Sequence, residues 1–190
     1  METQLTLGLD EAPPAERLFF AVMPDPAAID AIGHRIESLR HDEPLTARAL
    51  MPQRWHVTLH HLGDFAGIPP SLLERAYEVA SQVDATAFEV RFDQAGSFGG
   101  RSRHHPLVLR GDTGANAPLF ALQRQLGLRL ARAGMGHDDR FVPHLTLMYD
   151  RIRLENRPVA PVGWRVREFV LIRSFLGQTR YEFEGRWSLR

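Results

Sequence analysis

The chain contains no cysteine and no lysine, and the absence of cysteine narrows the chemistry that is open to it. Without cysteine there is no disulfide, no thiolate metal ligand and no cysteine nucleophile. No apolar run approaches the roughly 18 residues that a membrane helix needs, and no basic and apolar signal segment opens the chain. The glycine-rich loops that bind nucleotide phosphates are also missing, which leaves ATP-dependent chemistry without support. We therefore expect a cytoplasmic protein with no membrane segment.

Charge is balanced over the whole chain but not along it. The 23 basic residues equal the 23 acidic residues, so the formal net charge is zero. Residues 140–190 nevertheless hold 10 arginines and 5 acidic residues. This excess is compatible with a phosphate-bearing partner, although arginines on a solvated strand would give the same count. The acidic, proline-bearing residues 1–16 are expected to form a flexible leader, followed by a single bilobal domain over residues 17–190.

The spacing of apolar residues predicts a mixed fold with an internal repeat. Short apolar runs and alternating segments indicate strands, whereas spacings of three and four residues indicate helices. The expected strands are 17–24, 55–63, 87–98, 105–112, 140–150, 164–176 and 180–189, and the expected helices are 25–40, 71–83 and 116–134. A strand, a helix and a second strand recur at an offset of 88 residues. We expect an α+β fold of two pseudo-symmetric lobes, each a helix-covered antiparallel sheet, around a central cleft.

The second strand of each repeat carries the same tetrad, His-x-Thr-Leu. The first copy is His56 to Leu59 and the second is His144 to Leu147. Because side chains alternate between the two faces of a strand, each histidine shares a face with its threonine while the two aliphatic residues face the core. A pseudo-twofold relation between the lobes would bring both polar faces together in one cleft.

Two imidazoles and two hydroxyls in one cleft suit acid–base chemistry on a phosphodiester. One neutral imidazole can take a proton from water while a protonated one delivers a proton to the leaving oxygen. The hydroxyls of Thr58 and Thr146 can donate hydrogen bonds to phosphoryl oxygens. The scheme needs neither a metal nor a nucleophilic side chain, and a strained 2′,3′-cyclic phosphate is a suitable substrate. A single His-x-Thr strand is commonplace, and duplication of a purely structural strand would also give two copies.

Other polar side chains are candidates for substrate or metal binding. Arg140 and Arg103 are candidates for substrate binding. The alternative for Arg140 is a surface ion pair, and the alternative for Arg103 is a position in an exposed loop. A zinc site from His56, His60 and His61 is disfavoured, because positions i and i+4 of a strand lie about 13 Å apart. The predicted metal set is therefore none. Two aromatic residues are candidates for base stacking, with core packing as the alternative; they are Phe98 and Tyr181.

The sequence resembles the two-histidine (2H) phosphoesterase superfamily, and in particular its bacterial RNA 2′,3′-cyclic phosphodiesterase branch, historically labelled 2′-5′ RNA ligase. The resemblance is carried by the stretches LFFAVMP, HVTLHHLGD, GSF, RFVPHLTL and SFLGQTRYEFEGRW, which appear in the family's order. It implies that His56 protonates the leaving 3′-oxygen, that His144 activates water and that Thr58 and Thr146 hold the phosphate. The chain departs from the family at Tyr149, where an arginine is common, and at His61, where an aromatic residue is common.

The resemblance also implies the substrate and the product. The expected reaction is metal-independent hydrolysis of RNA 2′,3′-cyclic phosphate ends to 2′-phosphomonoesters, without a cofactor, by a monomer. It allows weak 2′-5′ RNA ligation as the reverse reaction. Two alternatives stay open: a phosphodiesterase that acts on a small cyclic nucleotide, and a catalytically idle RNA-binding module of the same fold.

Overall fold

The computed structural model describes residues 13–100, 103–136 and 140–190. Most of the expected leader, residues 1–12, lies outside the described residues. Strand β1 begins at Glu16, one residue before the expected start of the domain. Among the helices of these described ranges, none has the length and apolar character required to cross a membrane.

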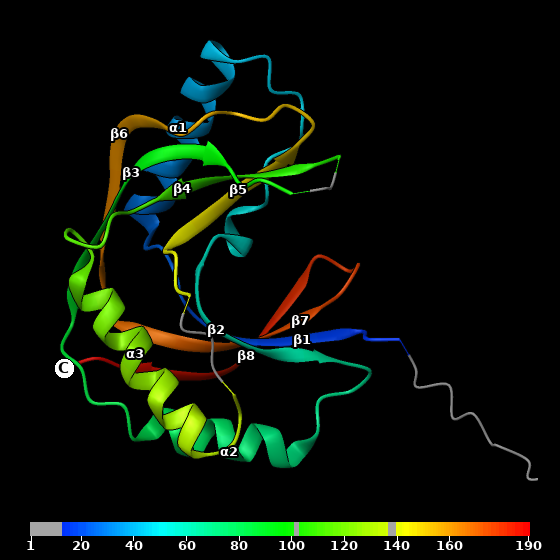
Figure 1. Cartoon of the computed structure of the whole chain (residues 1–190), viewed down its shortest axis with the longest axis vertical. Coiled ribbons are helices and arrows are strands. Elements are labelled where there is room, and N and C mark those ends of the chain that lie inside the picture. The colour runs from blue at the N-terminus through cyan, green and yellow to red at the C-terminus, as the bar shows by residue number, and fades with distance from the viewer. Residues whose placement is uncertain (1–12, 101–102, 137–139) are drawn as a thin grey trace, which may run out of the picture.

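Eight strands form one antiparallel sheet in the order β6-β3-β4-β5-β2-β1-β7-β8. Their bounds are β1 (Glu16–Val22), β2 (Val57–Phe65), β3 (Phe88–Ser97), β4 (His105–Arg110), β5 (His144–Asp150), β6 (Arg157–Val166), β7 (Glu168–Phe175) and β8 (Arg180–Ser188). The two central strands β2 and β5 pair at one position only, Val57 with Leu145. The sheet therefore consists of two four-stranded halves that diverge from this point (Figure 1). We call them the β2 half-sheet (β2, β1, β7, β8) and the β5 half-sheet (β5, β4, β3, β6).

The expected α+β fold with two similar antiparallel lobes is confirmed, but one strand prediction is wrong. The segment 164–176 is not one strand, because Arg167 separates β6 from β7. Strand β6 pairs with β3, whereas β7 pairs with β1 and β8, so the chain crosses between the half-sheets at this residue. Two consecutive polar residues, Arg167 and Glu168, interrupt the apolar alternation here, and buried residues resume at Phe169.

Three helices cover the sheet, and two of them contact strands of the half-sheet opposite to the one whose strands they connect. They are α1 (Pro26–Asp42), α2 (Pro70–Ser81) and α3 (Ala117–Arg132). The Asp25 side chain caps α1 by accepting a hydrogen bond from the Ala28 amide at 2.8 Å, as its place before Pro26 predicts. Helix α1 connects β1 to β2 but packs chiefly against β6 of the other half-sheet. Helix α3 connects β4 to β5 and contacts α2 and both β2 and β3, so each crossover helix ties the two halves together (Figure 1).

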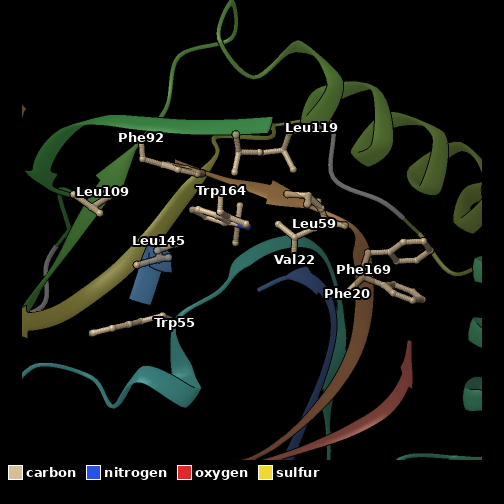
Figure 2. Packing of buried hydrophobic residues seen from close by; sticks show 14 of the residues in the cluster. Phe20, Val22, Trp55, Leu59, Phe92, Leu109, Leu119, Leu145, Trp164 and Phe169 are labelled. Carbon is tan, nitrogen blue, oxygen red and sulfur yellow. The ribbon is translucent and has the colours of Figure 1, made fainter. Parts of the chain in front are cut away.

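One hydrophobic core runs through both half-sheets. Phe20, Leu59 and Phe169 enter it from the β2 half-sheet, and Leu145 and Trp164 enter it from the β5 half-sheet (Figure 2). A second, small cluster lies on the opposite face of the β2 half-sheet; its buried members are Phe19, Ala21, Val170 and Ile172. The face of this half-sheet that opens toward the other lobe is therefore apolar at its base.

Asp150 fastens the segment that leads into the first tetrad. It ends β5, is fully buried, and its carboxylate accepts hydrogen bonds from the backbone amides of Thr46, Ala47 and Ile152 at 2.8 to 2.9 Å. Burial acts to raise the pKa of this carboxyl, but the amide donors outweigh it and hold the pKa below its ordinary value. The ionised carboxylate therefore joins the chain between α1 and β2 to the end of β5.

We expect Asp150→Asn to lower the free energy of unfolding by about 2 kcal/mol, because an amide has one acceptor oxygen for three donors. The deficit is present at pH 7 and shrinks as the pH falls through the lowered pKa, where the wild-type carboxylate also takes a proton. Urea unfolding of both proteins at pH 7 and at acidic pH measures it. Asp30→Asn, at an exposed position of α1, is the control; equal stability of the two variants would contradict the role of Asp150.

Candidate active site

Both tetrads border one cavity between the half-sheets. His56 lies immediately before β2, one residue outside the strand in which the sequence placed it, and His144 is the first residue of β5. The aliphatic members of both tetrads are buried in the core, as the alternation predicts; they are Val57, Leu59, Leu145 and Leu147. The two histidines and the two threonines line a cavity of about 490 Å³. The structure thus brings together the four polar side chains that the doubled motif singles out.

Each histidine is held by the carbonyl of the residue two positions before it. His56 Nδ1 lies 2.7 Å from the Arg54 oxygen, and His144 Nδ1 lies 2.8 Å from the Val142 oxygen. A carbonyl only accepts, so Nδ1 carries the hydrogen in both rings. In the neutral imidazole this leaves the Nε2 lone pair free. Both histidines are therefore fixed in the tautomer in which Nε2 exchanges protons.

Aromatic rings flank both imidazoles. The His56 ring lies 4.8 Å from Phe19 and 5.8 Å from Tyr181, measured between centroids. The His144 ring meets Phe98 edge-on at 4.8 Å. Of the two base-stacking candidates, Tyr181 lines the cavity and Phe98 stands behind His144. These rings limit the access of water to the imidazoles on the sides that face the protein.

The surroundings of both histidines disfavour their charged forms. Burial lowers the pKa of His56 to about 4; the hydrogen bond to Arg54 opposes this shift, and the charges of His144 and Arg54 add to it. Burial also lowers the pKa of His144, with a further contribution from the Arg110 guanidinium. Both imidazoles line the same cavity, so a positive charge on His144 disfavours one on His56. Without a bound anion, both are neutral at pH 7.

A charged cluster closes one side of the cavity. The Arg17 guanidinium makes a bidentate pair with Asp64, with both bonds at 2.7 Å, and His61 Nε2 donates to the same carboxylate at 2.9 Å. The bond from Arg17, with that from His61, lowers the pKa of Asp64 to about 2. His61 is half-exposed and lines the cavity. The buried histidine is its neighbour His60, which lies 2.7 Å from the Gln123 carbonyl.

The turn between β7 and β8 forms the other side of the cavity. Figure 1 shows this turn rising toward the β5 half-sheet, and residues 175–177 and Thr179 line the cavity. Thr179 has a φ of 54°, a left-handed backbone conformation that is strained for a β-branched residue. Strain of this kind persists only where the surrounding structure fixes the conformation, and it is concentrated at functional sites. Thr179 is therefore a candidate functional residue of the cavity, although no sequence pattern predicted it.

The structure separates the two arginines expected to bind substrate. Arg140 lines a second cavity of about 440 Å³, which shares Thr58, His61 and His144 with the first. Arg103 is exposed and does not line either cavity. Within the described part of the chain, no group of three His, Cys, Asp or Glu side chains is arranged to hold a metal. Arg54, which the sequence interpretation missed, lines the first cavity together with His56.

A two-lobed sheet with a doubled His-x-Thr tetrad in the cleft defines the two-histidine phosphoesterase class. Residues 25–175 match the 2′-5′ RNA ligase superfamily, so the chain belongs to this family. The crystal structure of Escherichia coli LigT in apo form is similar over 93% of this chain and 98% of its own, with 26% identity and a TM-score of 0.71. Its complex with 3′-AMP gives 28% identity and a TM-score of 0.73, over 92% and 98% of the two chains.

A more distant structure supports the fold alone. The protein TT0787 of Thermus thermophilus shares 22% identity and has a TM-score of 0.71, over 92% of this chain and 98% of its own. No curated protein sequence matches the chain significantly. The comparisons thus show the family, the fold and the phosphoesterase class. They do not specify the reaction, which has to be inferred from the geometry of the site.

The desolvated imidazoles predict an unusual titration. We expect the NMR signals of His56 to titrate with a midpoint near pH 4, and those of His144 to titrate below the ordinary value of 6.5. In urea both should return to about 6.5, since the shift comes from the folded environment. A folded-state midpoint of 6.5 or higher for His56 would contradict the environment described above.

Proposed function

We propose that the protein hydrolyses 2′,3′-cyclic phosphates at RNA ends to 2′-phosphomonoesters by paired-histidine acid–base catalysis. The observation that carries this proposal is the pair of imidazoles in one cavity, each with Nδ1 bonded to a carbonyl and Nε2 left for proton transfer. Two threonine hydroxyls from the same strands supply hydrogen-bond donors for the phosphoryl oxygens. Such a set performs in-line displacement at phosphorus without a protein nucleophile.

In the proposed step one histidine takes up a proton and the other releases one. Water attacks phosphorus and gives its proton to His144 Nε2, while the bond from phosphorus to the 3′-oxygen breaks. His56 Nε2 delivers its proton to that oxygen, and the 2′-phosphate remains on the ribose. The assignment of acid and base follows the family resemblance; the near-symmetric environment of the two rings permits either direction.

Similar proteins support a nucleotide ligand. The chain belongs to the 2′-5′ RNA ligase superfamily, and the similar E. coli LigT has been crystallised with 3′-AMP and with NADP⁺. A cavity of about 490 Å³ is within the range of small-ligand sites. We propose a monomer that needs no cofactor. Hydrolysis of a small cyclic nucleotide is the second candidate, favoured by the enclosure of the cavity between the half-sheets and the β7–β8 turn.

The first test is hydrolysis of a short RNA with a 2′,3′-cyclic phosphate end, in EDTA. We expect a 2′-phosphate product from the wild type and a fall in kcat of about 10²–10⁴-fold in His56→Ala and in His144→Ala. His41→Ala, at an exposed position of α1, is the matched control. Binding without cleavage by the wild type would indicate an idle RNA-binding module. Activity that requires a divalent metal would overturn the proposal.

The dependence of rate on pH tests the same mechanism independently. Catalysis needs one protonated and one neutral imidazole, so kcat/KM should be bell-shaped, with its maximum between the two free-enzyme pKa values. Both values are lowered, and the maximum should therefore lie below pH 6.5. Bound phosphate favours the imidazolium forms and should move the maximum of kcat to higher pH. A flat kcat/KM profile from pH 4 to 8 would contradict paired acid–base catalysis.

A further inference from the structure

Each catalytic-site histidine has an aromatic neighbour that carries an arginine. The Arg54 guanidinium lies over the Tyr181 ring, 5.1 Å from its centroid, and Tyr181 contacts His56. The Arg110 guanidinium lies over the Phe98 ring at 4.3 Å, and Phe98 contacts His144. A guanidinium stacked on a ring is held in place without losing its outward hydrogen-bond donors. The site therefore has one preoriented cation beside each imidazole.

Both arginines lack a carboxylate partner among the residues that the structure describes. The Nε atoms of Arg54 and Arg110 are also buried without a hydrogen-bond acceptor within the same ranges. Other arginines around the cleft are neutralised: Arg17 by Asp64, and Arg173 by Glu16. Unpaired, partly buried positive charge is unfavourable in the empty site, and an anionic ligand would relieve it.

The two arginines occupy different positions relative to the cavity. Arg54 lines it together with His56. Arg110 ends β4 directly opposite His144 in the β4–β5 pairing, on the same face of the sheet as that histidine, but it does not line the cavity. Phe98 stands at the end of β3, fixed by a hydrogen bond from its amide to the Pro106 carbonyl at 3.0 Å. An anion bound by Arg110 therefore lies beyond His144, outside the space that holds the reacting group.

We propose that Arg110 binds a second phosphate of the substrate, while Arg54 contacts the phosphoryl group that reacts. The inference rests on the proposed function, since it takes the cyclic phosphate to lie between the two histidines. The ligand class is a nucleotide with a phosphate in addition to the cyclic one. Two sources share this chemistry: the preceding phosphodiester of an oligonucleotide, and a terminal 5′-phosphate on a cyclic mononucleotide.

Three substrates and three variants test the proposal. The substrates are a 2′,3′-cyclic mononucleotide with a 5′-hydroxyl, the same compound with a 5′-phosphate, and a dinucleotide with a 2′,3′-cyclic phosphate end. The wild type should show a kcat/KM about tenfold higher for at least one two-phosphate substrate, the size of one charge-assisted hydrogen bond. Arg110→Met should abolish this gain. Arg54→Met should lower kcat/KM for all three substrates by a common factor.

Arg186→Met is the matched control. Its guanidinium also lies over a ring, Phe183 at 4.2 Å, but it pairs with Glu168 and does not line the cavity. This variant should retain both the rates and the gain from the second phosphate.

The outcomes separate this inference from the proposed function. A wild type that hydrolyses the mononucleotide without any gain from a second phosphate overturns the inference and leaves the function standing. An equal loss on all substrates in Arg110→Met overturns it too, because Arg110 would then act through His144. If Arg110→Met retains the gain from the second phosphate, the inference is overturned as well. A wild type that hydrolyses none of the three substrates overturns the proposed function itself.

Discussion

The single backbone pairing between Val57 and Leu145 is the contact on which the rest of the architecture depends. A sheet whose central strands paired along their length would place the two tetrads on one continuous surface. Because β2 and β5 separate after one pair, the sheet splits into halves, and His56 and His144 stand next to the point of divergence. The exchange of α1 and α3 between the halves keeps them together despite the sparse pairing at the centre. The cleft is thus a consequence of how the sheet is interrupted.

The same division explains why the histidines lie in a weakly polar setting. On the β2 half-sheet the cleft face rests on Phe19, Ala21, Val170 and Ile172, which form a small core separate from the main one. An imidazole placed against such a surface loses water on one side, and its charged form loses more free energy than its neutral form. The backbone carbonyls of Arg54 and Val142 fix which nitrogen carries the hydrogen but do not restore the lost hydration. Orientation and desolvation are therefore supplied by different parts of the fold.

The sequence predicted those features of the site that depend on residues close together in the chain. The tetrads are local, and strand alternation fixes the faces of their side chains, so His56, Thr58, His144 and Thr146 could be identified and placed in one cavity. The packing of α1 on β6 depends on contacts between segments far apart in the chain, and no spacing within α1 specifies them. Arg54 and Arg110 escaped prediction for a related reason. Each acquires its position through a ring contributed from elsewhere, Tyr181 and Phe98, and arginine is too common in this chain to stand out.

The two unpaired guanidiniums have a consequence for proton transfer within the proposed reaction. In the empty site, Arg54 and Arg110 act in the same direction as burial and keep His56 and His144 neutral. A phosphate between the imidazoles reverses the sign of the local field, because its negative charge favours the imidazolium form and at the same time pairs with the Arg54 guanidinium. Binding of the anion and uptake of the catalytic proton are then thermodynamically linked, so each makes the other more favourable. The general acid is accordingly charged when substrate is present, and a site with two neutral histidines at rest becomes one with a single proton to deliver.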